Sequence, residues 1–411
     1  MRLNVNYNGQ RIGQILSKNG ISYFEFDIRF IHSALPLSPL NLPVRKGVTI
    51  HEKKFLAGLP GLIYDSLPDG FGLSVIRDHF KSKAQPNPAP LQVLSYLGNR
   101  TMGALTYSPP DGDEAQQRSI DLVSAARSAR HLIELEHGTT LDPALIQAGG
   151  TAGGVQPKIL ASISKDGAII TGADAVPEGM TPWIIKLNTK NQKESAYAPL
   201  EYAYSQMAKD CGITVPKTNL LVDKNGIPHF AIKRFDRDET NPNVRIHTHT
   251  YAGLAEVDYQ SLSGSYEHLF ETTYALTRSY KELDQLLLRC IFNVLAHNHD
   301  DHSKNFSFQM DASGQWTLAP AYDLTISTNN LGGNWLTLNN KRREFSNRDL
   351  YSLVEAYGIS ESRVRDAVET VLAVVQKWNE YAAKCGVSSA LSKQAENYIS
   401  SSCATNFSSL A

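Results

Sequence analysis

Residues 298–308 read NHDDHSKNFSF and are followed closely by LAPAYDL at residues 318–324. Enzymes that transfer a phosphoryl group from ATP need one carboxylate to orient the attacking hydroxyl, and an amide oxygen and a second carboxylate to hold Mg²⁺. Asp300, Asn305 and Asp323 supply these groups in the order found in protein kinases. The stretch therefore predicts a kinase-like catalytic loop, with Asp300 as the base and with Asn305 and Asp323 as magnesium ligands.

Turn residues between the two parts favour this interpretation. The alternating segments 305–309 and 316–318 flank Asp-Ala-Ser-Gly at 311–314, which predicts the hairpin that follows a kinase catalytic loop. Two other interpretations remain open: a polar loop with a helix cap, or a metal-dependent hydrolase whose ligands would be His297, His299, Asp300, Asp301 and His302. Asp301 is expected to be a solvated loop carboxylate rather than an additional metal ligand.

A glycine-rich turn lies upstream, where residues 148–158 read AGGTAGGVQPK and run into a predicted strand. Phosphates can approach a backbone only where side chains are absent, and successive free N–H groups then form an anion-binding nest. The spacing is not that of a P-loop, because no Lys-Ser or Lys-Thr follows the last glycine. A flexible linker would look similar, so this turn indicates a phosphate site only in combination with the catalytic loop.

Lys186 is the expected lysine for the nucleotide phosphates, since it is centred in the short apolar strand WIIKL at 183–187. A lysine in such a strand is costly unless it is paired. Glu201, at the start of the following predicted helix, is its expected partner by analogy with the kinase lysine–glutamate pair. The alternative for Glu201 is an ordinary acidic residue at a helix N-terminus. The strand at 229–236 leads to the second lobe, and its backbone is expected to face adenine.

Hydrophobic periodicity predicts an α+β protein with two kinase-like lobes. Alternation over the first 30 residues, with turns at Asn8-Gly9 and Asn19-Gly20, predicts a small antiparallel meander. Further strands are predicted at 158–164, 183–187, 219–222 and 229–235, with a helix at 200–209. Beyond Asp236 the pattern is mainly helical, with long helices expected at 280–295 and 361–384.

These elements predict a division of the chain into a β-rich N-terminal subdomain, a kinase N-lobe with the glycine-rich loop, and a helical kinase C-lobe with the catalytic loop. The expected ranges are 1–110, 111–236 and 237–411. A length of 411 residues is too great for one ordinary core, which agrees with several packed units.

Composition limits the partners and the cellular compartment that we expect for the protein. A formal net charge of -1 removes any global electrostatic drive toward nucleic acid or an anionic membrane. The four cysteines are widely spaced and show no metal-binding pattern, which favours a reducing, cytoplasmic environment. No run of about 18 apolar residues is present, so we expect neither a membrane span nor export.

Two smaller patterns receive ordinary interpretations. His247 and His249 alternate as strand residues would, and two imidazoles without further ligands make no metal site, so they are expected to be exposed. The basic cluster at 341–343 is expected to be a solvated charge run, with contact to DNA phosphates as the alternative.

Taken together, these motifs resemble the HipA family of bacterial kinases. The resemblance rests on the glycine loop ending in Gln-Pro-Lys at 156–158, the Lys186 strand, KRFDR at 233–237, the catalytic block, and residues 318–324. The N-terminal meander, LSPL at 37–40 and DSLPDG at 65–70 are similar to the small domain that precedes the kinase core in full-length members. The resemblance covers nearly the entire chain.

The resemblance implies a serine/threonine protein kinase that acts as the toxin of a toxin-antitoxin pair and phosphorylates a host protein, with aminoacyl-tRNA synthetases as candidate targets. It implies ATP and Mg²⁺ as cofactors, a helix-turn-helix antitoxin of the HipB type, and operator DNA bound only through the antitoxin complex. It marks Thr151 as a self-inactivating autophosphorylation position. It places ATP against Gly153, Gly154, Val155, Gln156, Lys158, Lys186, Lys233, Arg234, Phe235, His302, Lys304, Asn305, Tyr322 and Asp323.

The chain departs from the best-known members at two positions, with Thr151 in place of serine and Asp301 in place of glycine. A threonine still offers a hydroxyl, so the first change bears on rate rather than on chemistry. Two alternatives to an active protein kinase remain: a catalytically weak co-repressor that mainly binds its antitoxin, and a small-molecule kinase with the same magnesium and base geometry.

Overall fold

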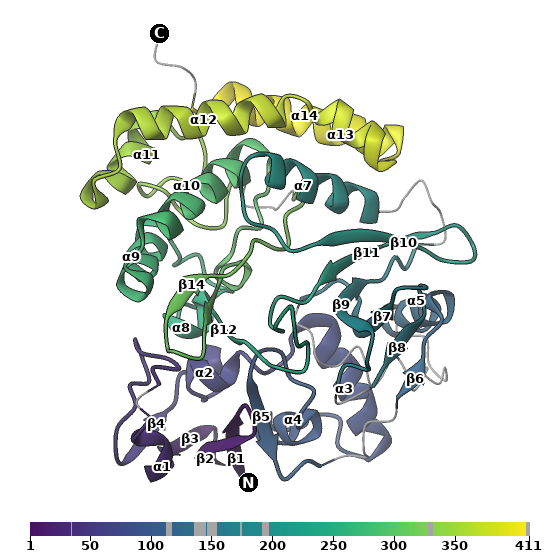
Figure 1. The fold of residues 1–411 in the computed structure, drawn as a ribbon, viewed down its shortest axis with the longest axis vertical. Helices are drawn as coiled ribbons and strands as arrows, with labels where there is room; N and C mark the ends of the chain where they lie inside the picture. The colour runs from purple at the N-terminus through teal and green to yellow at the C-terminus, as the bar shows by residue number, and fades with distance from the viewer. Residues whose placement is uncertain are drawn as a thin grey trace.

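The computed structural model describes residues 1–407 except 34, 112–116, 135–144, 146–153, 173–174, 191–196 and 328–331. The described residues form three β-sheets. Figure 1 shows the N-terminal sheet and the helical C-terminal part at opposite ends of the molecule, with the second sheet between them. The two lobes follow each other along the chain, as the hydrophobic pattern predicts.

The N-terminal sheet is antiparallel and has the order β4-β3-β2-β1-β5. Its strands are β1 Arg2–Tyr7, β2 Gln10–Lys18, β3 Ile21–Phe26, β4 Val48–His51 and β5 Leu105–Ser108. Asn8-Gly9 and Asn19-Gly20 form the two turns with positive φ at every position, as two-residue hairpin loops require. The predicted meander is confirmed, and its alternate residues, such as Val5, Ile15 and Phe24, are buried.

Short helices connect this sheet to the rest of the molecule. They are α1 Ile28–Ile31, η1 Lys54–Leu56, α2 Gly61–Tyr64, α3 Gly70–Ser82 and α4 Pro90–Leu97. Phe71 and Val75 of α3 belong to the core of the second sheet rather than to that of the first. The helix α3 therefore joins the N-terminal subdomain to the N-lobe.

The second sheet has the order β10-β11-β9-β7-β8-β6. Its strands are β6 Arg118–Ser119, β7 Lys158–Ser164, β8 Ile169–Thr171, β9 Met180–Lys186, β10 Thr218–Val222 and β11 Pro228–Lys233. Residues of α5, Leu122–Ile133, pack in one core with Trp183 and Ile185, whereas Ala198 of α7, Ala198–Asp210, packs in another with Ile184 and Ile232. Because successive strand residues point to opposite faces, Lys186 lies on the same face as Ile184 and so on the side of α7.

The C-lobe is mainly helical. Its helices are α8 Tyr251–Leu254, α9 Tyr266–Thr277, α10 Tyr280–Leu295, α11 Asn347–Val354, α12 Glu361–Val375, α13 Trp378–Cys385 and α14 Ser389–Thr405, with the short turns η3 Ser303–Asn305 and η4 Glu355–Tyr357. Its small sheet contains β12 His247–Thr250, β13 Ser307–Met310 and β14 Trp316–Leu318. The predicted helix at 280–295 and the predicted hairpin are confirmed.

The single helix predicted over 361–384 is wrong, because the chain turns at Lys377 and forms α12 and α13 in its place. The turn buries Trp378, whose ring lies 5.5 Å from that of Tyr204 on α7 and whose indole N–H donates to the Ser392 carbonyl at 2.9 Å. Burial of a large aromatic side chain stabilises this break in the helix. Within the described ranges no helix has the length and apolar character that a membrane crossing needs.

Candidate active site

Lys186, at the end of β9, stands at the centre of the site between the lobes. Its amine forms ion pairs with the carboxylates of Glu201 on α7 and of Asp323 in the loop after β14. The Lys186 and Glu201 side chains are only 7% and 6% exposed, whereas Asp323 keeps 34%. The predicted partnership of Lys186 with Glu201 is present, and the lysine also reaches the loop that carries the predicted magnesium ligand.

Lys186 on one side and Glu201 and Asp323 on the other shift each other's pKa values toward the charged forms. Burial lowers the pKa of the Lys186 amine, but the Asp323 and Glu201 carboxylates outweigh burial and raise this pKa above its usual value. Burial raises the pKa of Asp323, but Lys186 and Lys158 hold it well below its usual range. Burial raises the pKa of Glu201, with Lys186 opposing the shift. Asp323 is therefore a carboxylate at neutral pH, the form that binds a cation.

The predicted catalytic loop follows α10 and carries Asp300. The Asp300 side chain is 52% exposed and lies 3.9 Å from the His302 imidazole. The Asn305 side-chain amide donates to the Asp300 backbone carbonyl at 2.7 Å, which fixes the loop. Burial raises the pKa of Asp300 and His302 lowers it, with a net upward shift that makes the ionised carboxylate a stronger proton acceptor.

Tyr322 positions Asp323 by joining two loops. Its hydroxyl donates to the Lys304 carbonyl at 2.7 Å, and its ring stacks on Phe235, with ring centroids 5.5 Å apart. Asp323 itself has a φ of 55°, a left-handed conformation that a non-glycine residue adopts only when its surroundings hold it there. The stacked pair therefore connects the strand between the lobes to the end of the catalytic segment.

The described end of the glycine-rich loop lies beside this group. Lys158 pairs with Lys186 in the register of β7 and β9, and its side chain is buried. Gly154 has a φ of 96°, a conformation that residues with a side chain rarely adopt, so the position favours glycine. Thr151 and Gly153, both predicted to contribute to the site, lie outside the described residues.

The charged side chains of residues 233–237, which connect the two lobes, form ion pairs within the protein. The Arg234 guanidinium is bound to the Asp236 carboxylate at 2.8 and 2.6 Å, and Arg237 contacts the same carboxylate at 2.9 Å. Lys233 pairs with Glu239 at 3.2 Å. The backbone is also engaged, since the Lys233 and Arg234 N–H groups donate to the Lys217 and Pro182 carbonyls and the Phe235 carbonyl accepts from Gln309 at 2.6 Å. The contact of this segment with adenine stays a prediction.

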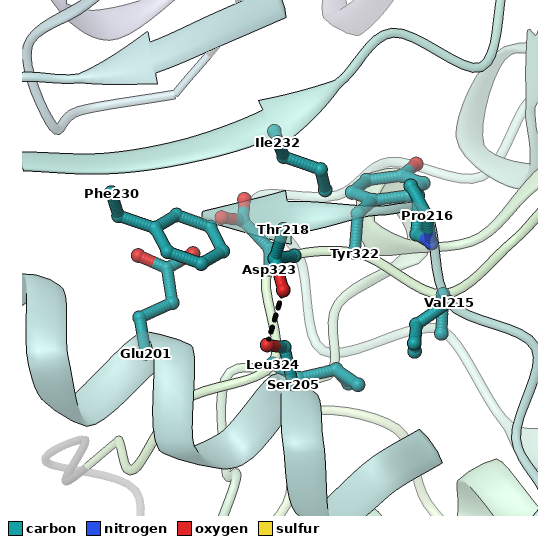
Figure 2. Close-up of a pocket in the computed structure, with 11 residues that line it drawn as sticks. Glu201, Ser205, Val215, Pro216, Thr218, Phe230, Ile232, Tyr322, Asp323 and Leu324 are labelled. Atoms are coloured by element: carbon teal, nitrogen blue, oxygen red, sulfur yellow. Dashed lines mark hydrogen bonds between the residues drawn. The ribbon is translucent and has the colours of Figure 1, made fainter. Parts of the chain in front are cut away.

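A small pocket beside the group of Lys186, Glu201 and Asp323 is lined by residues of α7, β10, β11 and the loop after β14. Figure 2 shows Glu201 and Asp323 at its wall, with Phe230 and Ile232 from β11. Ser205 and Thr218, also at the wall, are bonded to each other at 2.9 Å. Both carboxylates that bind Lys186 therefore line this pocket.

The metal-hydrolase alternative is not supported by the described residues, which contain no group of three or more His, Cys, Asp or Glu side chains able to hold a metal. His297 instead shares a hydrogen bond with the Ser402 hydroxyl at 2.7 Å, and its ring stacks on that of Tyr398.

His247 and His249 are buried, so their predicted exposure is wrong. They bond to the Leu37 carbonyl at 2.7 Å and to Asp65 at 2.5 Å, contacts with the N-terminal subdomain that a local pattern does not contain.

The prediction of a solvated Asp301 is also wrong, since this side chain is fully enclosed. It accepts hydrogen bonds from the Tyr266 hydroxyl at 2.6 Å and the Asn334 amide at 3.0 Å, and from the Trp335 backbone N–H at 2.6 Å. The donors come from α9 and from the segment after 331, and only the fold brings them to the catalytic loop. Asp301 therefore anchors that segment beside Asp300.

The basic cluster at 341–343 is only partly the solvated run that its composition predicts. Arg342 donates to the Asn334 carbonyl at 3.1 Å and to the Leu262 carbonyl at 2.8 Å. Lys341 forms an ion pair with Asp349 at 2.8 Å. Arg342 therefore holds the segment that Asp301 anchors, whereas Lys341 is bound to α11.

We expect the Asp301→Asn variant to change how stability depends on pH. Burial raises the pKa of Asp301 to about 6, opposed by its hydrogen-bond donors. Because the folded-state pKa is raised, the stabilisation from this group is complete below about pH 4 and is lost as pH rises through about 6. Urea unfolding of both proteins at several pH values should show the wild type losing about 3 kcal/mol relative to Asp301→Asn across this window. A constant difference would contradict the assignment.

Comparison with known proteins agrees with this geometry. Residues 150–378 match the family model described as the HipA-like C-terminal domain, and residues 3–108 match that of the HipA N-terminal domain. The chain belongs to the HipA family. This HipA-family chain is similar to HipA of the Shewanella oneidensis MR-1 toxin-antitoxin system, which was solved in complex with HipB and operator DNA. The two structures superpose with a TM-score of 0.70 at 16% sequence identity, and the match covers 98% of this chain and 96% of that chain. The predicted two-lobed, kinase-like α+β fold is confirmed.

Two curated relatives of this HipA-family chain come from Sinorhizobium fredii. "Putative kinase Y4dM" is 26% identical over 341 residues, which are 78% of this chain and 76% of the relative. "Putative kinase Y4mE" is 25% identical over 245 residues, 56% of each protein.

Sequence reasoning missed residues of the N-terminal subdomain that reach the site. Asp69 forms an ion pair with Lys304 at 2.6 Å and also accepts a hydrogen bond from the Gly154 backbone N–H. The motif DSLPDG at 65–70 was a signal of family resemblance, but nothing in it indicated contact with a lysine 235 positions away.

Proposed function

We propose that the protein is an ATP- and Mg²⁺-dependent serine/threonine protein kinase. The observation that carries this proposal is the ion pairing of Lys186 with both Glu201 and Asp323, beside Asp300 and Asn305. In protein kinases the lysine–glutamate pair and the metal-binding aspartate must both be in place for phosphoryl transfer. The two relatives named as kinases agree with the proposal.

The donor set suits Mg²⁺, which prefers oxygen ligands. Asn305 uses its amide nitrogen to bind the Asp300 carbonyl, which leaves the amide oxygen for a cation, and Asp323 is ionised and partly exposed. Bound Mg²⁺ would neutralise charge on the transferred phosphate. Lys186 would bind the nucleotide phosphates, and Asp300 would orient the attacking hydroxyl and take its proton.

Incubation of the purified protein with labelled ATP, Mg²⁺ and cell lysate tests this function. We expect label to enter a protein band in the presence of wild type and not of Asp300→Asn, and mass spectrometry of the band should find phosphoserine or phosphothreonine. Label in a small molecule alone would favour the small-molecule kinase. Absence of transfer by a folded protein would favour the antitoxin-binding co-repressor.

We also propose that this kinase is the toxin of a toxin-antitoxin pair, with a helix-turn-helix antitoxin of the HipB type, operator DNA bound through that complex, and a host protein such as an aminoacyl-tRNA synthetase as substrate. The solved HipA complex with HipB and operator DNA supports the choice of partner. Induced expression should arrest growth, Asp300→Asn should abolish the arrest, and co-expression of a neighbouring antitoxin gene should relieve it. Equal toxicity of Asp300→Asn would contradict a catalytic mechanism.

Thr151 is the proposed site of self-inactivation. Phosphorylation would add about -1.5 to -2 charges to a glycine-rich loop that receives the anionic phosphates of ATP, so ATP affinity should fall. We expect prolonged incubation with Mg²⁺ and ATP to phosphorylate Thr151 in wild type but not in Asp300→Asn, as mass spectrometry can show. Full ATP affinity of the phosphorylated protein would mean that regulation lies elsewhere.

A further inference from the structure

Residues 69–71, at the start of α3, are bound to the end of the glycine-rich loop. The Gly154 N–H donates to one Asp69 carboxylate oxygen, and the Phe71 N–H donates to the Gly154 carbonyl at 3.0 Å. Gly70 has a φ of 46°, and a Cβ atom there would lie 2.4 Å from the Gly154 carbonyl oxygen. The two backbones are therefore in direct contact, and the contact depends on glycine at position 70.

The second Asp69 oxygen reaches the catalytic loop. It lies 2.6 Å from the Lys304 amine, and the two side chains are only 20% and 15% exposed. The same amine lies 5.0 Å from the centre of the Tyr64 ring and 4.2 Å from that of the Tyr259 ring, so that Lys304 is held by aromatic faces as well as by a charge. One carboxylate thus joins the glycine-rich loop of the N-lobe to the catalytic loop of the C-lobe.

This carboxylate is charged at neutral pH. Burial raises the pKa of Asp69, but Lys304 and the Gly154 N–H outweigh burial and bring it below the usual value. Hydrogen bonds to a charged group are about twice as strong as those between neutral groups, and partial burial limits their screening by solvent. The connection between the two loops is therefore stronger than an exposed ion pair would be.

We propose that Asp69 is a positioning residue of the kinase site, which ties the described end of the glycine-rich loop, at Gly154, to the catalytic loop and makes the N-terminal subdomain part of the active site. The proposal rests on the kinase function proposed above. A loop end that is already held in place costs less conformational entropy when nucleotide binds, and Lys304 is kept at a defined place beside Asn305. Without the Asp69 charge, both advantages should be lost.

The N-terminal subdomain should stay on the C-lobe when this connection is removed, because other contacts hold it there. Asp65 accepts hydrogen bonds from the Thr250 N–H and hydroxyl, both at 2.7 Å. A Cβ atom on Gly61 would lie 1.9 Å from the Gly253 carbonyl oxygen, which shows how closely α2 and α8 pack. Loss of the Asp69 charge therefore tests loop positioning rather than detachment of the subdomain.

A matched control is available at the same boundary. Lys53 of the N-terminal subdomain forms an ion pair with Glu256 of the C-lobe at 2.5 Å, and its side chain is 51% exposed. This pair involves neither the glycine-rich loop nor the catalytic loop. Lys53→Met removes the lysine charge of this pair and leaves the Glu256 carboxylate, which is 8% exposed. Because both residues lie away from the two loops, the variant should change neither nucleotide binding nor turnover by more than about twofold.

The test compares Asp69→Asn, Lys53→Met and wild type by three measurements on the full chain. Asparagine keeps an oxygen for the Gly154 N–H but removes the charge that binds Lys304. In the ligand-free protein we expect hydrogen exchange of the peptide containing Gly154 to be about tenfold faster in Asp69→Asn only. We expect the dissociation constant of a fluorescent ATP analogue with Mg²⁺ to rise about tenfold, and kcat to fall by a similar factor.

Lys304→Met provides a further check, because its effect on nucleotide binding should not add to that of Asp69→Asn if both remove the same connection. Unchanged exchange at the Gly154 peptide, equal effects of Asp69→Asn and Lys53→Met, or tighter nucleotide binding by Asp69→Asn would each overturn the proposal. The exchange measurement needs no nucleotide. It therefore decides the role of Asp69 even if wild type transfers no phosphate, a result that would refute only the kinase function.

Discussion

Replacing Asp300 or Asp323 by Asn is expected to reduce phosphoryl transfer by roughly a thousandfold or more while the protein stays folded. Asparagine at 300 cannot accept the proton of the attacking hydroxyl. Asparagine at 323 removes the negative charge that binds Mg²⁺. Asp300 is half exposed, and Lys186 keeps Glu201 as a partner when Asp323 is changed, so neither substitution leaves a buried charge alone.

Initial rates of label transfer and thermal unfolding of each variant measure the two parts of this prediction. Glu361→Gln is a suitable control, because it removes a carboxylate of the same lobe whose ion pair with Arg365, at 3.8 Å, is solvent-exposed. Its rate and its unfolding midpoint should equal those of wild type. A well-folded Asp300→Asn or Asp323→Asn protein with wild-type transfer would show that the site has been assigned incorrectly.

The second large effect is expected for Lys186→Met, which should lower both activity and stability. Removing the amine leaves Glu201 buried without its cation, and loss of one partner of a buried pair typically costs about 3 kcal/mol. Transfer should fall roughly a hundredfold or more, because the phosphates lose a charge that acts in a partly dry site. Urea unfolding and label transfer measure the two effects separately.

A double variant separates the structural and catalytic roles of this lysine. Adding Glu201→Gln to Lys186→Met removes the unpaired buried charge, so part of the lost free energy of unfolding should return. Activity should not return, because the phosphates still lack the lysine. If the double variant were less stable than Lys186→Met, the ion pair would not be the reason for the instability.

Much of the local structure follows from patterns that the sequence displays. Alternation and two Asn-Gly turns predict β1 to β3, and a helical period predicts α10 at its observed ends. The same reasoning fails at 361–384, since the break at Lys377 depends on the burial of Trp378 against α7 rather than on a local signal.

Some contacts of the candidate site can also be predicted from the sequence, and others cannot. The sequence predicts a counter-charge for Lys186, because a lysine centred in an apolar strand needs one, and the analogy with protein kinases names Glu201, although a helix N-terminal acid is an equal alternative that only the structure excludes. The burial of Asp301 could not be predicted, because its donors come from Tyr266 and from residues 334–336. A polar residue in a loop has the same local appearance whether it is solvated or enclosed.

The sequence by itself determined the order of the elements and the chemical types at the site, since turn residues, periodicity and motif spacing act over a few positions along the chain. Only the tertiary structure decided which polar groups are buried and what each one meets. Asp69 and Lys304 are 235 positions apart, and their contact exists because the N-terminal subdomain packs on the C-lobe. Burial and pairing depend on such packing, because the free energy of a charge is set by whatever surrounds it and not by its neighbours in sequence.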